Sequence, residues 1–280
     1  MNRREFMRTC LATGTAALLP GCSIVPVKPD GSPEPVPIDK LFEQGARVMW
    51  CVPHPDDECF TGGLLARASI YWGNPLYFLI LTHGEGGECG LSRGCKPDLG
   101  AVRGQEMIQA AKRYRATLQH EHFFNAPLPV SSFPEVDELH AIWKRHKDPT
   151  QVIVQAIDSF KPDLLLTLDP DFGATGHPEH KLTSRLVKNA AQKASHRVRR
   201  MYHVVNRYWL LWLIGKADPG GITEVFDGHL PATYNESCVE FMLRATRLHR
   251  TQHGDMGTVR EYPSAFAEVC LRQVDYHNQK

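Results

Sequence analysis

Two short clusters of histidine and carboxylate side chains could do chemistry. The first runs from His54 to Glu58 as His-Pro-Asp-Asp-Glu, and the second runs from His177 to His180 as His-Pro-Glu-His. Two histidines and one carboxylate with a fourth position left open form a known type of catalytic zinc site, because the zinc then keeps a water molecule. Zinc lowers the pKa of that water to about 7, which makes hydroxide available at neutral pH. The two clusters therefore suggest metal-assisted hydrolysis, provided that the fold brings them together.

The first cluster holds more carboxylates than a zinc site needs. One of Asp56 and Asp57 can bind the metal while its neighbour accepts the proton of the water. A structural alternative exists for each motif alone, since an aspartate after a strand often caps the next helix. In the second cluster, His177 and His180 are three residues apart at a predicted helix start, so their side chains share a face. Pro178 suits the first helical position, where the missing N–H costs nothing.

The elements that must position these clusters alternate between strands and helices. Continuous apolar runs predict strands over residues 47–53, 75–82, 122–124, 163–168 and 200–205. Helical patterns predict helices over residues 62–72, 99–114, 135–146, 151–160, 178–194 and 236–252. This alternation predicts one α/β domain, a Rossmann-like, mostly parallel sheet with helices on both faces. Each cluster follows a strand, so both fall at the carboxyl edge of the sheet, where such folds bind ligands.

The composition excludes several classes of protein. The chain has 280 residues, of which 42% are hydrophobic and 22% are charged, as expected for a globular domain with a sizeable core. These values exclude a disordered tail, a coiled coil and a multi-span membrane protein. The 32 basic residues nearly balance the 31 acidic ones, which gives a net charge of +1. No nucleic-acid partner is expected, because the chain has no basic excess.

The N-terminus is predicted to be an export signal. Arg3 and Arg4 resemble the twin-arginine export motif, and the uncharged stretch that follows is too short to span a bilayer. The stretch ends at Cys22 in a sequence similar to a lipobox, in which the cysteine receives the lipid. The alternative is an ordinary secretory peptide with a chance cysteine. Ser23 favours the outer membrane by analogy with bacterial lipoproteins, so we expect a periplasm-facing lipoprotein of the cell envelope.

The chain is thus predicted to have three parts. A signal peptide covers residues 1–21, a proline-rich tether covers residues 22–38, and a catalytic domain covers residues 39–280. Cys89 and Cys95 enclose a short glycine-containing loop that can close as a disulfide in an oxidising envelope. Two free thiols are the alternative.

The two clusters resemble the two motifs of the PIG-L/LmbE-like N-acetylglucosaminyl deacetylases. Three stretches agree more weakly, namely Thr82-His-Gly-Glu, Arg103-Gly-Gln-Glu and Leu248-His-Arg-Thr-Gln. The resemblance implies a zinc-dependent hydrolase that removes the acetyl group from an N-acetylated amino sugar, an N-acetylglucosamine-type glycoside. A zinc amidase that acts on another amide and a non-catalytic sugar-binding lipoprotein are the alternatives.

The same resemblance assigns roles position by position. It makes His54, Asp57 and His180 the zinc ligands and Asp56 the general base. It makes His177 the residue that stabilises the oxyanion or helps the leaving amine.

Two further positions carry weaker expectations. Arg103 can contact sugar hydroxyls or a charged aglycone, and an ion pair with Glu106 is the equally plausible alternative. Glu179 stands where the family has an aspartate, and the resemblance gives it no part as a ligand and little importance.

Overall fold

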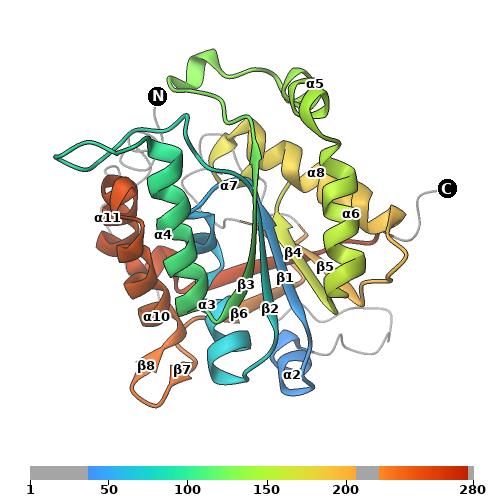
Figure 1. The fold of residues 1–280 in the computed structure, drawn as a ribbon. Coiled ribbons are helices and arrows are strands. Elements are labelled where there is room, and N and C mark those ends of the chain that lie inside the picture. The colour runs from blue at the N-terminus through green and yellow to red at the C-terminus, as the bar shows by residue number, and fades with distance from the viewer. Residues whose placement is uncertain (1–36, 206–220, 277–280) are drawn as a thin grey trace.

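A seven-stranded sheet forms the centre of the molecule (Figure 1). The computed structural model describes residues 37–205 and 221–276. The strands follow the order β3-β2-β1-β4-β5-β9-β6 across the sheet. The first five strands pair in parallel, whereas β9 pairs antiparallel with β5 and β6. The strands of this sheet are β1 (Val48–Val52), β2 (Leu76–Thr82), β3 (Ala116–Phe123), β4 (Leu164–Leu168), β5 (Arg200–Val205), β6 (Glu224–Asp227) and β9 (Glu268–Gln273).

Helices cover both faces of the sheet (Figure 1). One face packs against α2 (Ile38–Glu43), α3 (Gly62–Ala66), α4 (Leu99–Arg113), α10 (Cys238–Ala245) and α11 (His253–Glu261). The other face packs against α5 (Val136–His146), α6 (Pro149–Phe160) and α8 (Pro178–Lys193). A four-residue helix, α7 (Gly173–Gly176), precedes α8, and a small hairpin of β7 (Pro231–Thr233) and β8 (Glu236–Ser237) precedes α10. The predicted Rossmann-like, mostly parallel single domain is therefore confirmed.

The apolar strands build two cores because successive side chains point to opposite faces of a sheet. In β1, Val48, Trp50 and Val52 belong to the core under α3, α4 and α10. Met49 and Cys51 of the same strand belong to the core under α5, α6 and α8. All five side chains are fully buried. A strand buried on both faces has no polar position, which explains the continuous apolar runs of the sequence.

The order of the strands creates a switch point between β1 and β4. From β1 the chain continues to β2 and β3 on one side, and it returns on the other side as β4 and β5. The loops after β1 and β4 therefore leave the same sheet edge in opposite directions, and a crevice forms between them. The two clusters of histidine and carboxylate residues follow these two strands.

Some predicted elements are wrong or incomplete. The predicted helix over residues 236–252 is instead α10, which ends at Ala245, and two 3₁₀ turns before α11. Side-chain hydrogen bonds to this segment compete with the helical pattern: Thr246 bonds the Leu243 carbonyl, and Thr251 bonds Glu106. The strand predicted over residues 122–124 is longer, since β3 is an edge strand whose polar residues hide its pattern.

The predictions for the N-terminus fall largely outside the described residues. The signal peptide, the lipid on Cys22 and most of the tether belong to residues 1–36 and stay predictions. In the part of the chain that the structure describes, no helix combines the length and apolar character needed to cross a membrane.

Candidate active site

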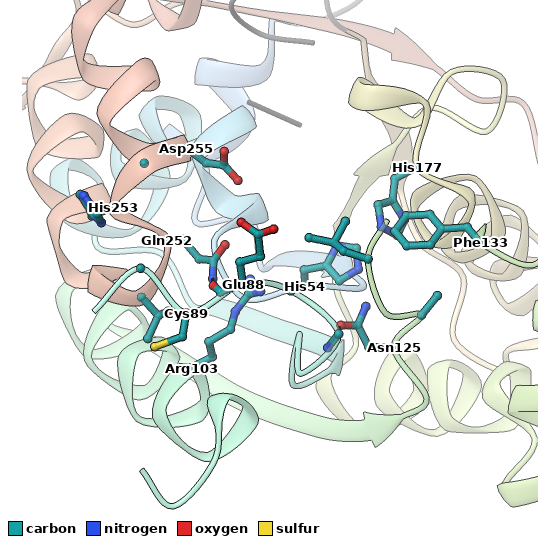
Figure 2. A pocket seen from close by; sticks show the side chains of 17 residues that line it. His54, Glu88, Cys89, Arg103, Asn125, Phe133, His177, Gln252, His253 and Asp255 are labelled. Carbon is teal, nitrogen blue, oxygen red and sulfur yellow. Dashed lines mark hydrogen bonds between the residues drawn. The ribbon is translucent and has the colours of Figure 1, made fainter. Parts of the chain in front are cut away.

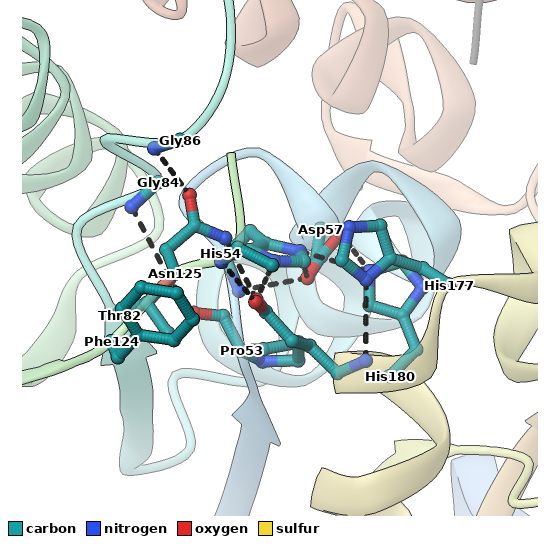
Figure 3. A network of polar contacts seen from close by, with 12 residues as sticks. Pro53, His54, Asp57, Thr82, Gly84, Gly86, Phe124, Asn125, His177 and His180 are labelled. Carbon is teal, nitrogen blue, oxygen red and sulfur yellow. Dashed lines mark hydrogen bonds and ion pairs between the residues drawn. The ribbon is translucent and has the colours of Figure 1, made fainter. Parts of the chain in front are cut away.

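Three side chains from two neighbouring strand ends converge on one point (Figure 3). His54 and Asp57 follow β1, and His180 lies in the first turn of α8. Nδ1 of His54 lies 3.0 Å from Nε2 of His180. The carboxylate of Asp57 lies 3.3 Å from Nδ1 of His54 and 3.1 Å from Nε2 of His180. All three residues are buried.

The hydrogen bonds behind the two rings fix which nitrogens carry protons. Nε2 of His54 donates to the Glu179 carboxylate at 2.5 Å, and Nδ1 of His180 donates to the Gly173 carbonyl at 2.6 Å. In the neutral state that binds a metal, the two rings turn lone pairs toward each other and toward Asp57. Two lone pairs and a carboxylate this close repel one another unless a proton or a metal cation lies between them. The donor set therefore fits zinc, which binds imidazole nitrogen and carboxylate oxygen.

Glu179 has a larger part in this site than the sequence suggested. Its buried carboxylate accepts hydrogen bonds from three donors: Nε2 of His54, Nδ2 of Asn125 at 2.8 Å and the backbone N–H of Ala126 at 2.7 Å. An outer carboxylate of this kind orients a metal-binding histidine and raises its basicity. The expectation that Glu179 matters little is thus wrong, because its carboxylate holds the His54 ring and the loop after β3. Asn125, which follows β3 at the same sheet edge, was not identified from the sequence.

Burial and nearby charges act in opposite directions on the cluster. Burial alone would lower the pKa of His54, but Asp57 and Glu179 outweigh it and raise that pKa to about 9. Burial would raise the pKa of Asp57, but His180 and His54 hold it well below its usual range. Asp57 is therefore ionised at neutral pH, as a metal ligand must be.

A second possible metal group consists of His54, His177 and Glu179. Its carboxylate already accepts the three hydrogen bonds described above. In addition, Nδ1 of His177 accepts a hydrogen bond from the backbone N–H of Glu179 at 3.2 Å. Because these lone pairs are in use, the first group is the better metal site.

Asp56 lies in a strained turn beside the ligands. Its φ of 87° places it in the left-handed region, which aspartate and asparagine tolerate better than most residues. The side chain is fully buried, and its carboxylate lies 3.3 Å from the Arg103 guanidinium. The predicted role of Asp56 as general base is compatible with this position next to Asp57 but stays a prediction.

Arg103 lies at the edge of the pocket and contacts mainly its own chain. Its guanidinium donates to the carbonyls of Gly84 at 3.0 Å and Pro55 at 2.7 Å, besides its contact with Asp56. A Cβ at Gly84 would come within 2.5 Å of Arg103, so this position requires glycine. These contacts favour a role in positioning Asp56. The predicted contact with sugar hydroxyls remains a prediction, since Arg103 also lines the pocket.

His177 caps α8 and faces the pocket. Pro178 occupies the first turn of α8 as predicted, and the His177 side chain accepts the hydrogen bond of the N-cap. Because Nδ1 is an acceptor there, the ring proton is on Nε2, which can donate to a substrate. The ring lies 4.7 Å from the ring of His54 and 4.6 Å from that of Phe133, measured between centroids.

A pocket of about 240 Å³ opens above this cluster (Figure 2). His54, His177 and Phe133 line one side of it, and residues of the segment 251–255 line another. Thus the pocket reaches the candidate metal site through His54 and meets Nε2 of His177.

The three weaker motifs also gather around the pocket. Thr82 anchors the strand exit, because its backbone N–H and its hydroxyl both donate to the Pro53 carbonyl, at 2.8 and 2.9 Å. Glu106 accepts hydrogen bonds from the backbone N–H and the hydroxyl of Thr251, at 2.9 and 2.6 Å. It therefore ties α4 to the segment after α10 rather than to Arg103. His249 of that segment bonds the buried Glu58 carboxylate at 2.5 Å.

The loop between β2 and α4 forms another wall of the pocket. Cys89 and Cys95 form a disulfide in this loop, which confirms the predicted bridge. Cys89 and Gly90 line the pocket, and the Gly90 N–H donates to the Thr251 carbonyl at 2.7 Å. The four other cysteines of the described chain are buried.

The fold and the site together define an α/β protein with a candidate metal-binding pocket at its switch point. The family model described as PIG-L, GlcNAc-PI de-N-acetylase, matches residues 49–191. The chain therefore belongs to the PIG-L family, as the sequence motifs implied.

Known proteins with related sequences include a 1D-myo-inositol 2-acetamido-2-deoxy-alpha-D-glucopyranoside deacetylase of Mycobacterium sp. (strain KMS). That protein is 25% identical over 176 residues, which cover 59% of this chain and 56% of the relative. The chain thus spans about half the length of this curated relative.

Two solved structures illustrate the shared fold. One is the N,N'-diacetylchitobiose deacetylase from Pyrococcus horikoshii, with a TM-score of 0.59 and 15% identity over 85% of this chain and 87% of that one. The other is GalB, the 4-carboxy-2-hydroxymuconate hydratase from Pseudomonas putida KT2440, with a TM-score of 0.56 and 13% identity over 84% and 98%. Since a deacetylase and a hydratase share this fold, the fold alone does not identify the reaction, and the side chains of the site determine it.

Proposed function

We propose that this protein is a zinc-dependent hydrolase that removes the acetyl group from an N-acetylated amino sugar. The observation that carries the proposal is the convergence of His54, Asp57 and His180 beside a pocket, with Glu179 behind the first ligand. Membership of the PIG-L family supports an amide of this kind, and the mycobacterial relative is named for deacetylating a 2-acetamido sugar.

The mechanism follows from the positions of the side chains. His54, Asp57 and His180 would hold Zn²⁺, which would supply a Lewis acid that polarises the amide carbonyl and acidifies water. Asp56 takes the proton of the attacking water and passes it to the leaving nitrogen. His177 donates from Nε2 to the carbonyl oxygen as negative charge develops there.

Positioning residues prepare these groups in advance. Glu179 holds the His54 ring, and the Gly173 carbonyl holds the His180 ring. Arg103 clamps the strained turn by bonding the Pro55 carbonyl and contacting Asp56. The geometry of the catalytic groups is thereby fixed before substrate binds, which lowers the reorganisation that the reaction requires.

Replacing Asp56 by asparagine tests the mechanism. Asparagine also tolerates the left-handed turn, but it cannot accept the proton. We expect D56N to retain zinc while the release of acetate from N,N'-diacetylchitobiose falls by about 10²–10⁴-fold. Metal content, melting temperature and kcat are measured on the same samples, with the exposed Asp171→Asn as the matched control.

A D56N protein that binds zinc and turns over at the wild-type rate would contradict the proposal. If Asp56 had only a capping role, D56N would keep near-normal stability and turnover, because asparagine caps a helix as well as aspartate does. A panel of other amides, offered to the wild type in parallel, distinguishes a sugar deacetylase from a general zinc amidase.

We also propose that the protein acts in the cell envelope, attached through a lipid on Cys22. The proposal is supported by the sequence of residues 1–22 alone. Export should stop when Arg3 and Arg4 are both replaced by lysine, and Cys22→Ala should release a soluble or unprocessed protein. Normal membrane attachment of the Cys22→Ala variant would contradict the lipoprotein proposal.

A further inference from the structure

A second cavity, of about 480 Å³, lies next to the candidate active site. We call it the arginine cavity, because Arg247, Arg250 and Arg260 line it together with His253. Arg247 and Arg250 lie in the 3₁₀ turns after α10, and Arg260 lies in the last turn of α11. Arg247 and Arg250 are exposed, so the cavity is open to solvent on that side.

The positive charges of this cavity have no carboxylate partners in the part of the chain that the structure describes. None of its lining residues is acidic, and within the described ranges none of the three arginines has a carboxylate oxygen within 4.0 Å. Arg260 instead donates to the Thr246 hydroxyl at 3.1 Å. Partial burial and the charge of Arg247 lower the pKa of Arg260.

A nearby arginine provides a contrast. Arg244, on α10, has its guanidinium 3.1 Å from the Glu236 carboxylate. His249, which also lines the cavity, is hydrogen-bonded to the buried Glu58 carboxylate. Unbalanced guanidinium groups around a cavity create a positive potential that favours a phosphate or a carboxylate.

The arginine cavity and the catalytic pocket share a wall. Gly90 and His253 line both of them. Gly90 packs so closely that a Cβ would lie 2.7 Å from the Thr251 carbonyl and 2.8 Å from Nδ1 of His253. The disulfide loop and the start of α11 therefore meet edge to edge, and the two spaces lie on either side of this wall. A ligand would have to extend over the wall to occupy both spaces.

The two spaces differ in charge. Glu88 and Asp255 line the catalytic pocket together with Arg103, whereas the neighbouring cavity is lined by three arginines and no acidic residue (Figure 2). An anionic group is thus favoured more strongly in the second space than in the first. This polarity would orient a substrate whose acetylated sugar is neutral and whose other end is negatively charged.

We propose that the arginine cavity binds an anionic group, a phosphate or a carboxylate, on the aglycone of the N-acetylated sugar. The inference rests on the proposed deacetylase function and adds the substrate class: glycosides of an N-acetylated amino sugar with an acidic aglycone. Arg247 and Arg250 bind the anion, while Arg260 lies behind them and adds to the positive potential. Guanidinium groups suit this purpose because they offer planar, paired donors to phosphate and carboxylate oxygens.

The test measures binding and needs no turnover. Three ligands are titrated by calorimetry into zinc-loaded full-length D56N protein: N,N'-diacetylchitobiose, its 1-phosphate, and the disaccharide in which glucuronate replaces the second sugar. We expect at least one acidic ligand to bind about tenfold more tightly than the neutral one. The phosphate and carboxylate arms show which anion the cavity prefers.

Variants then locate the preference. Glutamine keeps the length and polarity of arginine but removes the charge, so R247Q/R250Q should bind acidic and neutral ligands with affinities within about twofold. R244Q is the matched control, and it should keep the full preference because Arg244 does not line the cavity. A missing preference in the parent protein, or a preference that survives in R247Q/R250Q, would overturn the inference.

Failure of the proposed function would look different. If the wild type releases no acetate from any of the three compounds but the arginine-dependent preference is present, the cavity is supported and the deacetylase proposal is not. If acetate is released equally well from acidic and neutral compounds and R247Q/R250Q changes nothing, the deacetylase proposal stands and this inference fails.

Discussion

At the scale of single residues, the candidate metal site depends on a carboxylate that binds no metal. Glu179 is fully buried, and its acceptor capacity is used by His54, Asn125 and the backbone of Ala126. Glutamine at this position has one carbonyl oxygen and two unwanted N–H donors in place of the second oxygen. It cannot satisfy all three donors and carries no charge to support the His54 ring.

We therefore predict that Glu179→Gln weakens zinc binding. The loss of an outer-shell carboxylate typically lowers metal affinity by about 10–100-fold. Zinc affinity is measured by competition with a chromophoric chelator, with the exposed Glu138→Gln on α5 as the control. Equal zinc affinity in wild type and E179Q would show that the His54 ring is held adequately by other contacts.

His177 allows its two roles to be separated. The side chain caps α8 through Nδ1 and can donate to substrate through Nε2. Serine keeps a capping oxygen but lacks the imidazole. His177→Ser should thus retain zinc and most of its stability.

The turnover of His177→Ser should nevertheless fall by about 10²–10³-fold, as expected when one oxyanion donor is lost. Metal content, melting temperature and kcat for acetate release check this expectation. A large loss of stability with unchanged kcat would instead assign His177 a purely structural role.

At the scale of elements, the disulfide loop shapes the pocket wall. Cys89 and Gly90 line the pocket, and the loop is bonded to the segment after α10 through Gly90 and Thr251. A double replacement, Cys89→Ser with Cys95→Ser, frees the loop without changing the core. The bridge closes only a short loop, so its contribution to stability is about 2–3 kcal/mol.

We expect this double variant to have a clearly higher KM for N,N'-diacetylchitobiose. Its melting temperature should decrease only slightly. Steady-state kinetics and thermal unfolding, both without reductant, provide the two measurements. Wild type treated with reductant has the same bridge opened, so in a separate measurement it should behave like the double variant. An unchanged KM would mean that the wall holds its shape without the bridge.

The sequence predicted the elements whose apolar residues follow a regular pattern. Strands buried on both faces and helices with regular apolar spacing were identified because one dominant signal, burial, sets their pattern. The segment after α10 was misread because side-chain hydrogen bonds to Glu58 and Glu106, distant in sequence, interrupt its helical pattern. The strands β6 and β9 were missed for a related reason, since pairing between distant antiparallel segments leaves little local signal.

The candidate site was also predictable only in part: short motifs identify some of its residues, whereas others depend on how distant loops fold. His54, Asp57 and His180 stand in motifs at strand ends, so the topology alone brings them together. Asn125 and the hydrogen bonds of Glu179 depend on how the loop after β3 folds back, and no short motif encodes that contact. The arginine cavity likewise arises where a loop after β2 meets the last helices.

At the scale of the whole molecule, the sheet carries a buried histidine that links stability to pH. His203 lies in β5 opposite Arg272 of β9, and it is 5% exposed. Its Nε2 has no hydrogen-bond partner within the described chain. Burial, with the charges of Arg272 and Lys188, lowers the pKa of His203 to about 3.

The depressed pKa of His203 determines the sign of the effect. Below its ordinary pKa of about 6.5, this histidine takes up a proton in the unfolded chain but stays neutral in the folded one. The unfolded state then binds more protons, so the free energy of unfolding decreases as the pH falls from about 6.5 toward 3. Between pH 6.5 and pH 5 the expected loss from this one group is about 2 kcal/mol.

His203→Leu should remove this loss, because leucine has no titratable group and fills a similar buried space. We predict that the free energy of unfolding of H203L declines less steeply than that of wild type between pH 6.5 and 5, by about 2 kcal/mol. Urea unfolding at fixed zinc concentration measures both proteins, and taking the difference cancels every group that they share, the metal ligands included. The exposed His229→Leu serves as the control and should follow the wild-type curve. If the free energies of unfolding of wild type and H203L change in parallel with pH, His203 becomes protonated in the folded sheet. That result would require a hydrogen-bond acceptor or a water molecule beside Nε2, which is buried between β5 and β9.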